Sequence, residues 1–242
     1  GPEQTLGSVA FNALLDDGDR LAFQVFTTPA DTTKLLYGDL NYARAWADGA
    51  FWTEFGASAS HSRDGDRPPI LAPVSEVERI YGRITVPVLR ARAQSLWTHL
   101  AFDARGTDLY DPVGPDTDEV TNIVRASANY TFIVGDTRGD AMIELAHGLD
   151  AFGASQNGDP ALTRADGRPQ FTKVRLDASV QHKFDDRWEF VVMAEGQLAD
   201  GALVAAEEFG GGGARFGRAY DYSAIVGDTG IDADISDMKE HR

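Results

Sequence analysis

The segment Thr172–Phe184, TKVRLDASVQHKF, alternates between apolar and polar side chains. The apolar set is Val174, Leu176, Ala178, Val180 and Phe184. The polar set is Lys173, Arg175, Asp177, Ser179, Gln181 and Lys183. Successive side chains of a β-strand point to opposite faces of the sheet. The segment therefore predicts a strand with one apolar face and one charged face.

The same period of two recurs along the chain, for instance over 77–91, 121–134 and 186–199, where Val191 and Met193 are exceptions. The pattern predicts eleven strands, several of them longer than the five or six residues usual in soluble proteins. Their expected ranges are 8–15, 20–28, 37–46, 50–61, 77–91, 94–106, 121–134, 139–153, 171–184, 186–199 and 218–226.

The connections between these strands alternate between short and long. Short turns such as DDGD and GDTR are followed by long linkers such as SRDGDRPPILAPVSE and SQNGDPALTRADGRPQ. Outer-membrane barrels have short periplasmic turns at one rim and long external loops at the other. The alternation therefore favours an all-β fold, an antiparallel transmembrane β-barrel.

A soluble antiparallel sheet remains open at this point, because one solvated polar face also produces period two. Aromatic residues near the strand ends suit the interfacial girdles of a membrane barrel, and they suit the core of a sandwich equally well. These aromatic residues are Trp46, Trp52, Tyr130, Phe184 and Trp188.

Composition restricts the classes of function. The 242 residues carry a formal net charge of −16, which disfavours nucleic acid as a partner because phosphate backbones attract basic surfaces. The chain has no cysteine, which excludes disulfides, thiolate metal ligands and cysteine nucleophiles. No apolar run approaches the roughly 20 residues of a membrane helix.

The residues also disfavour an enzyme. The five histidines show no spacing typical of a shared metal, and no serine lies in a nucleophile-elbow context. The five histidines are His61, His99, His147, His182 and His241. The Gly210–Gly213 run lacks the Lys-Ser/Thr of a phosphate-binding loop. We therefore predict no catalytic residue, no metal site and no cofactor.

The stretch 205–230, AAEEFGGGGARFGRAYDYSAIVGDTG, carries several spaced elements together. They are Glu208-Phe209, a Gly-Gly pair, an Arg-centred core and a Gly-Asp-x-Gly close behind. This combination resembles the outer-membrane translocators of two-partner secretion, of the haemolysin-activator type. The strand layout agrees with that resemblance from about residue 6 to residue 230.

The resemblance implies that a Gly-rich sixth external loop, at about 200–217, folds back into the barrel lumen. Arg218 would hold this loop by contacting acidic or aromatic side chains of the inner wall. A guanidinium offers a rigid fork of donors for a desolvated carboxylate. Ala219 replaces the central Gly of the family. The expected lumen-loop motif is Gly212, Gly213, Arg215, Phe216, Gly217, Arg218, Tyr220, Asp221, Gly227 and Asp228.

The family barrel has sixteen strands, preceded by periplasmic POTRA domains that capture the substrate, so the eleven visible strands imply a partial barrel or an altered closure. Residues 1–5 are expected to be a tag-cleavage remnant and lead-in, and 6–230 the barrel region. Residues 231–242, IDADISDMKEHR, are expected to be a charged tail without strand character.

The resemblance further implies a monomeric transporter in the outer membrane of a Gram-negative bacterium, surrounded by lipid and lipopolysaccharide. It would export a large secreted partner protein, an adhesin or cytolysin, through a hydrated barrel without ATP. Two other functions stay open: a soluble β-sheet binding or structural domain, and a porin-like passive channel.

Overall fold

The computed structural model describes residues 3–63, 67–68, 70–185, 188–211 and 225–239. Within them the regular structure is β-strand apart from two short 3₁₀ turns, η1 (Ala47–Gly49) and η2 (Ala205–Glu207). No described helix is long and apolar enough to cross a membrane. The strands are β1 (Thr5–Asn12), β2 (Asp19–Thr27), β3 (Leu35–Trp46), β4 (Phe51–Arg63), β5 (Val74–Arg90), β6 (Gln94–Tyr110), β7 (Thr117–Val134), β8 (Thr137–Gly148), β9 (Thr172–Lys183), β10 (Trp188–Ala199), β11 (Phe209–Gly211), β12 (Ile225–Gly227) and β13 (Gly230–Lys239).

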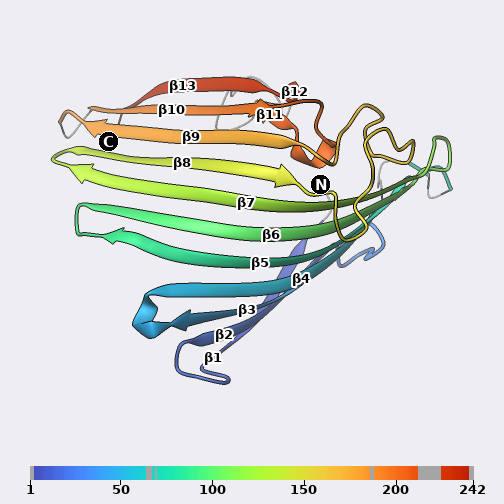
Figure 1. Cartoon of the computed structure of the whole chain (residues 1–242), viewed down its shortest axis with the longest axis horizontal. Coiled ribbons are helices and arrows are strands. Elements are labelled where there is room, and N and C mark those ends of the chain that lie inside the picture. The colour runs from blue at the N-terminus through green and yellow to red at the C-terminus, as the bar shows by residue number, and fades with distance from the viewer. Residues whose placement is uncertain (1–2, 64–66, 69, 186–187, 212–224, 240–242) are drawn as a thin grey trace. The chain divides into compact units, whose positions relative to one another are not determined.

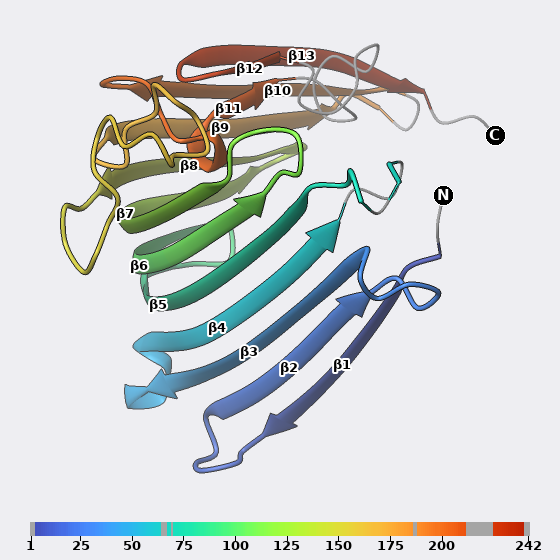
Figure 2. The same ribbon diagram turned by 90° about the vertical axis from the view of Figure 1, so that its right-hand side faces the viewer.

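Strands that follow one another in the sequence lie next to one another in the sheet. The order of the eleven-stranded sheet is β1 to β10 and then β13, as Figures 1 and 2 show. The short strands β11 and β12 form a separate antiparallel pair. The predicted all-β antiparallel class is confirmed.

Ten of the eleven predicted strands correspond to β1–β10, with boundaries that move by a few residues. The largest differences are at β8, which ends at Gly148, at β6, which ends at Tyr110, and at β7, which begins at Thr117. The predicted strand 218–226 lies mostly outside the described residues, and its last two positions belong to β12.

The expectation that residues 231–242 lack strand character is wrong for residues 231–239. They belong to β13, which pairs antiparallel with β10 from Gly230 opposite Gln197 to Lys239 opposite Trp188. Backbone N–H and C=O groups make a ladder whatever the side chains are, and the open edge of β10 supplies the partner groups. The frequent acids of this stretch conceal the alternation of Ile231 and Ala233 with Asp232.

The chain divides into two compact units. The first comprises residues 1–85, 101–124 and 148–170, and the second comprises 86–100, 125–147 and 171–242. Strands β5 to β8 each contribute residues to both units. The two units are described separately below.

In the first unit the described part of the apolar face is largely exposed along β2 to β5. Phe23, Leu40, Ala57 and Ile80 are successive neighbours in register on β2 to β5. The exposed fractions of Phe23, Leu40 and Ile80 are 47%, 49% and 66%. On the opposite, charged face Asp103 is 7% exposed and pairs with Arg79.

The second unit repeats this arrangement on β8, β9 and β10. Leu145, Val174 and Leu198 form one row of the apolar face and are 48%, 38% and 63% exposed. Lys173 and Gln197 lie on the charged face and are 6% and 2% exposed. In a soluble sandwich the apolar face packs inside. An uncovered apolar face combined with a covered charged face is the arrangement expected of strands that contact lipid.

Aromatic side chains lie near the ends of this apolar face. In the first unit Trp46 stacks on Phe51, with 6.1 Å between ring centroids, and its Nε1 donates to Thr53 Oγ1 at 2.9 Å. Trp52 follows Phe51 on β4 and therefore lies on the opposite face. In the second unit His182 contacts Phe184 edge to face. Aromatic side chains at these positions suit a membrane interface, as the sequence predicts for Trp46 and Phe184.

Replacing Leu176, in the middle of the apolar face of β9, with Arg should destabilise the protein in lipid vesicles by about 2–4 kcal/mol. The reason is that the guanidinium would be forced into hydrocarbon. The measurement is urea unfolding in vesicles, followed by tryptophan fluorescence. Ser127→Arg is the control, since Ser127 is two residues from Arg125 on the charged face. Equal losses for both variants would contradict the assignment of the faces.

Candidate functional site

The segment that follows β10, residues 200–211, folds back onto the charged face of the second unit. Leu203 and Val204 are fully buried, and Phe209 and Glu207 are 7% and 9% exposed. The turn η2 places Glu207 at its end, and Glu207 N donates to Val204 O at 2.9 Å. A polar connection between strands is normally solvated at the surface. This one has its own small core.

Glu207 is the charged centre of the contact. Its carboxylate accepts a two-fold hydrogen bond from Arg125 of β7, with Nη2 to Oε1 at 2.6 Å and Nη1 to Oε2 at 3.1 Å. Lys173 of β9 approaches Oε2 at 2.8 Å. A bidentate guanidinium–carboxylate pair fixes direction as well as distance. We call Glu207, Arg125 and Lys173 the anchor cluster.

The backbone of the segment is held by the same wall. Glu207 O accepts from Lys173 Nζ at 2.8 Å and from Gln197 Nε2 at 3.1 Å. The side chains of Lys173 and Gln197 are also joined, at 3.2 Å. A buried polar group costs little only when it is hydrogen-bonded. The described partners of Glu207 meet this condition for both its charge and its carbonyl.

The anchor cluster continues into other charged groups of the face. Arg125 Nη1 also donates to Glu144 Oε1 of β8 at 3.3 Å. Beyond it, Arg175 contacts Asp177 at 3.0 Å and Glu195 of β10 at 3.2 Å. Charges of both signs therefore lie along the same face and pair with one another.

A second clamp comes from the far end of the Gly-rich stretch. Asp228 Oδ1 accepts from Leu203 N at 2.6 Å, and Asp228 O accepts from Gln197 Nε2 at 3.2 Å. Strands β11 and β12 pair Phe209 with Gly227. The Phe209 ring lies over Gly230 so closely that a Cβ there would collide with the ring. The two flanks of the stretch are thus fastened to each other and to β10.

The environment of Glu207 lowers the pKa of its carboxyl below its usual value of 4.5. Burial on its own would raise the pKa, because it penalises the charged form. The hydrogen bonds and positive charges of Arg125 and Lys173 outweigh burial. Glu207 is therefore ionised at neutral pH.

The structure places only part of the predicted lumen-loop motif. Gly227 lies in β12, and Asp228 follows it and clamps Leu203. The other predicted residues lie outside the described part of the chain: Gly212, Gly213, Arg215, Phe216, Gly217, Arg218, Tyr220 and Asp221. Their role stays a prediction.

The sequence reasoning missed the anchor cluster. It expected a cation of the loop to contact an acid of the wall, whereas the described contact joins an acid of the loop to two cations of the wall. A signal was present: Glu207 lies two residues before Phe209 in the stretch that carries the resemblance, and Lys173 is a cation on a strand of an acidic chain.

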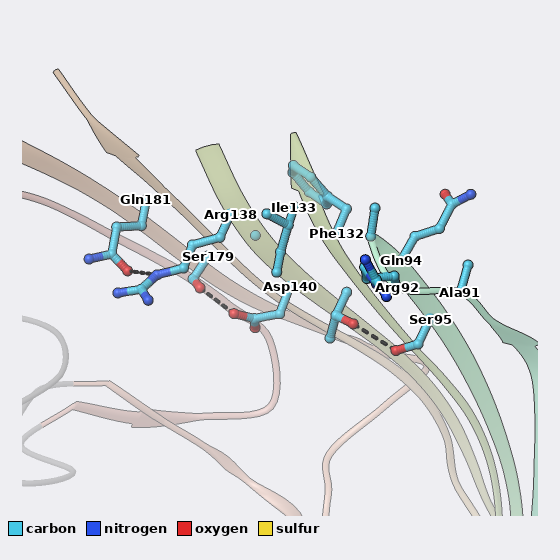
Figure 3. Close-up of a pocket in the computed structure, with 13 residues that line it drawn as sticks. Ala91, Arg92, Gln94, Ser95, Phe132, Ile133, Arg138, Asp140, Ser179 and Gln181 are labelled. Atoms are coloured by element: carbon cyan, nitrogen blue, oxygen red, sulfur yellow. Dashed lines mark hydrogen bonds between the residues drawn. The ribbon is translucent and has the colours of Figure 1, made fainter. Parts of the chain in front are cut away.

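A recess of about 370 Å³ lies on the second unit, beside the turns that join β5 to β6 and β7 to β8 (Figure 3). Its polar side chains pair with one another: Ser95 with Thr131 at 2.7 Å, Asp140 with Ser179, and Arg138 with Gln181. No nucleophile–base pair lies among them. No group of three potential metal ligands occurs among the described residues of the chain.

Glu207→Gln should loosen the segment 200–211. The change removes the described counter-charge of the buried Lys173 and leaves Glu144 as the described acidic partner of Arg125, and removing one partner of a buried pair costs about 3–5 kcal/mol. Hydrogen exchange of the Leu203 and Glu207 amides measures the local opening free energy. Unchanged protection of both amides would show that the anchor cluster does not hold the segment.

The lowered pKa of Glu207 predicts a pH dependence. Its contribution to anchoring is complete above about pH 4.5, the usual pKa, and is lost as pH falls through the lowered pKa. A nitroxide attached at Ala206→Cys should be immobile at pH 7 and become mobile as the pH falls through the lowered pKa of Glu207. In the Glu207→Gln background this pH dependence should be absent. An identical transition in both backgrounds would assign the effect to other carboxyl groups.

Comparison with known proteins agrees with this description. The family model "Haemolysin secretion/activation protein ShlB/FhaC/HecB" matches residues 117–232. That family is one of secretion proteins rather than of enzymes. No curated protein matches the chain at a significant level.

Three solved structures share the fold. CdiB from Escherichia coli is 17% identical with a TM-score of 0.76 and covers 97% of this chain and 44% of its own. CdiB from Acinetobacter baumannii is 13% identical with a TM-score of 0.69, and the match covers 98% of this chain and 44% of the CdiB chain. BamA from Haemophilus ducreyi, solved without POTRA domains 1–3, is 10% identical with a TM-score of 0.66. The match covers 96% of this chain and 49% of the BamA chain.

This chain thus spans less than half the length of the structures that it matches. The family match includes β7 to β10 and the anchor cluster. The structural matches include nearly all of the chain and show the barrel fold. Together they confirm the predicted resemblance and the predicted outer-membrane localisation: residues 117–232 match the family model, and nearly the whole chain shares the fold of these barrel structures.

Proposed function

We propose that this chain forms part of the wall of an outer-membrane transporter that exports a large secreted partner protein. The partner is of the adhesin or cytolysin class, and it crosses in an unfolded form through a hydrated passage that the charged face lines. Export uses no ATP, and folding of the partner outside the cell gives the direction. The transporter is a monomer surrounded by lipid and lipopolysaccharide.

The observation that carries this proposal is the position of segment 200–211 on the charged face. The apolar face is uncovered, so the charged face is the side from which lipid is excluded. Segment 200–211 is fastened to that side by Glu207, and it leads directly into the Gly-rich stretch. The stretch therefore starts inside the passage that we propose.

We further propose that Arg218 attaches the Gly-rich loop to the inner wall at a second point. The resemblance assigns the loop arginine to an acidic or aromatic partner on the inner wall, which would add to the described contact of Glu207. Two fastening points of opposite charge would hold the loop at both ends of its glycine run. Ala219 next to Arg218 would place a Cβ where the family has none.

The test is export of the secreted partner from cells that carry Glu207→Gln or Arg218→Ala. Each variant should lower the partner in the culture medium several-fold while the outer-membrane level of the transporter stays unchanged. Glu3→Gln is the charge-matched control, since it makes the same charge change at an exposed residue of the lead-in, outside the loop. Small-ion conductance in planar bilayers should change in the two loop variants as well.

Normal export by both loop variants would contradict the proposed role of the anchored loop. Steady conductance together with an absence of any exported partner would support a porin-like channel instead.

A further inference from the structure

The turn between β1 and β2 exposes two leucines in a fixed conformation. Leu14 and Leu15 are 51% and 76% exposed, at the tip of the turn 13–18 of the first unit. Single exposed apolar residues are common on protein surfaces. Two adjacent leucines at a tip that is tightly held by hydrogen bonds call for a physical reason.

Asp19 holds this tip. Its Oδ1 accepts from Leu14 N at 2.7 Å, and its Oδ2 accepts from Leu15 N at 2.8 Å and from Asp16 N at 3.1 Å. Ala13 N also donates to Asp19 O at 3.0 Å. Asp19 is only 4% exposed, so the clamp is itself covered.

The clamp holds a strained backbone. Ala13 has a φ of +55°, which L-residues other than Asn and Asp rarely adopt. Such strain persists where the surrounding contacts over-determine the conformation, and it is typical of functional segments. Here the clamp holds the strained turn in a conformation in which both leucines are exposed.

The turn curls toward the apolar face. Asp19 begins the row of β2 that continues at period two through Leu21 and Phe23, which belong to that face. Tyr42 Oη donates to Asp19 Oδ2 at 3.0 Å, and Arg44 pairs with Asp16. The turn is thus tied to the outer side of β3.

The surroundings on that side have the composition of a membrane interface. The Arg44 guanidinium lies over the Trp46 ring at 4.2 Å, and Trp46 stacks on Phe51. Aromatic rings together with Arg collect at the level of lipid head groups. The leucine tip lies beside this belt and extends the lipid-facing surface past the end of the sheet.

We propose that Leu14 and Leu15 insert into the phospholipid leaflet on the side of the short turns, so that the turn 13–18 anchors the first unit at the membrane surface. This inference rests on the outer-membrane placement of the chain. A protein partner fits less well, since a stable interface buries about 800 Å² on each side and two leucines offer only part of that. Lipid requires no further complementary surface.

The absence of cysteine from the sequence makes a direct test possible. Leu15→Cys is labelled with an environment-sensitive dye, and the full chain is refolded into vesicles of phosphatidylethanolamine and phosphatidylglycerol. Nitroxide-bearing lipids should quench this dye several-fold more strongly than a dye at Asp17→Cys in the same turn. Aqueous iodide should quench the dye at position 17 more strongly.

A dye at Leu40→Cys, on the uncovered apolar face, distinguishes failure of this inference from failure of the membrane placement. Lipid quenching at position 40 with only aqueous quenching at position 15 would overturn the inference and leave the membrane placement intact. Aqueous quenching at position 40 would overturn both.

A second variant tests the clamp. In the Leu15→Cys background Asp19→Ala should lower lipid quenching several-fold, because the three backbone donors lose their acceptor. A separate protein that combines Asp19→Ala with a dye at Leu40→Cys reports whether the sheet still forms. Unchanged lipid quenching at position 15 would overturn the assigned role of Asp19.

Discussion

The long strands β2 to β10 divide their side chains between two environments, and the rest of the described structure depends on that division. Leu176 and Val174 of β9 lie on the uncovered apolar face, whereas Lys173 and Arg175 lie on the face where charges are paired. The backbone ladder satisfies the N–H and C=O groups between strands, so hydrocarbon can contact the apolar face without exposing polar backbone. A shift of one residue in register would exchange the two faces completely.

The charged face can then accommodate groups that would be too costly in contact with lipid. Glu207 is buried, yet it has a guanidinium and an ammonium as partners. Removing ions from water is expensive, and it is offset only when the remaining hydrogen-bonding capacity is met. The three groups therefore specify one position of the segment 200–211. An apolar contact alone would permit several.

Close packing of glycine against aromatic rings recurs on both units. In the first unit the Tyr81 ring lies so near Gly56 that a Cβ there would collide with it, and Tyr81 Oη reaches Asp39 at 3.3 Å. In the second unit Phe209 lies over Gly230 in the same way. Each glycine provides the space in which a ring can lie flat on the sheet, and this helps to place the polar groups around it.

The sequence by itself determined the positions of ten strands, the two-faced character of each and the resemblance to translocators, because period two and turn residues are local properties. Val191 and Met193, the two apolar exceptions to the alternation in β10, lie on the charged face, since their partners in register on β9 are Gln181 and Ser179. Only the tertiary structure decided which face is left without protein cover. It also brought together Arg125 and Glu207, which lie 82 residues apart, and it paired the acidic stretch of β13 with β10. These contacts depend on partners distant in sequence, and no local pattern specifies them.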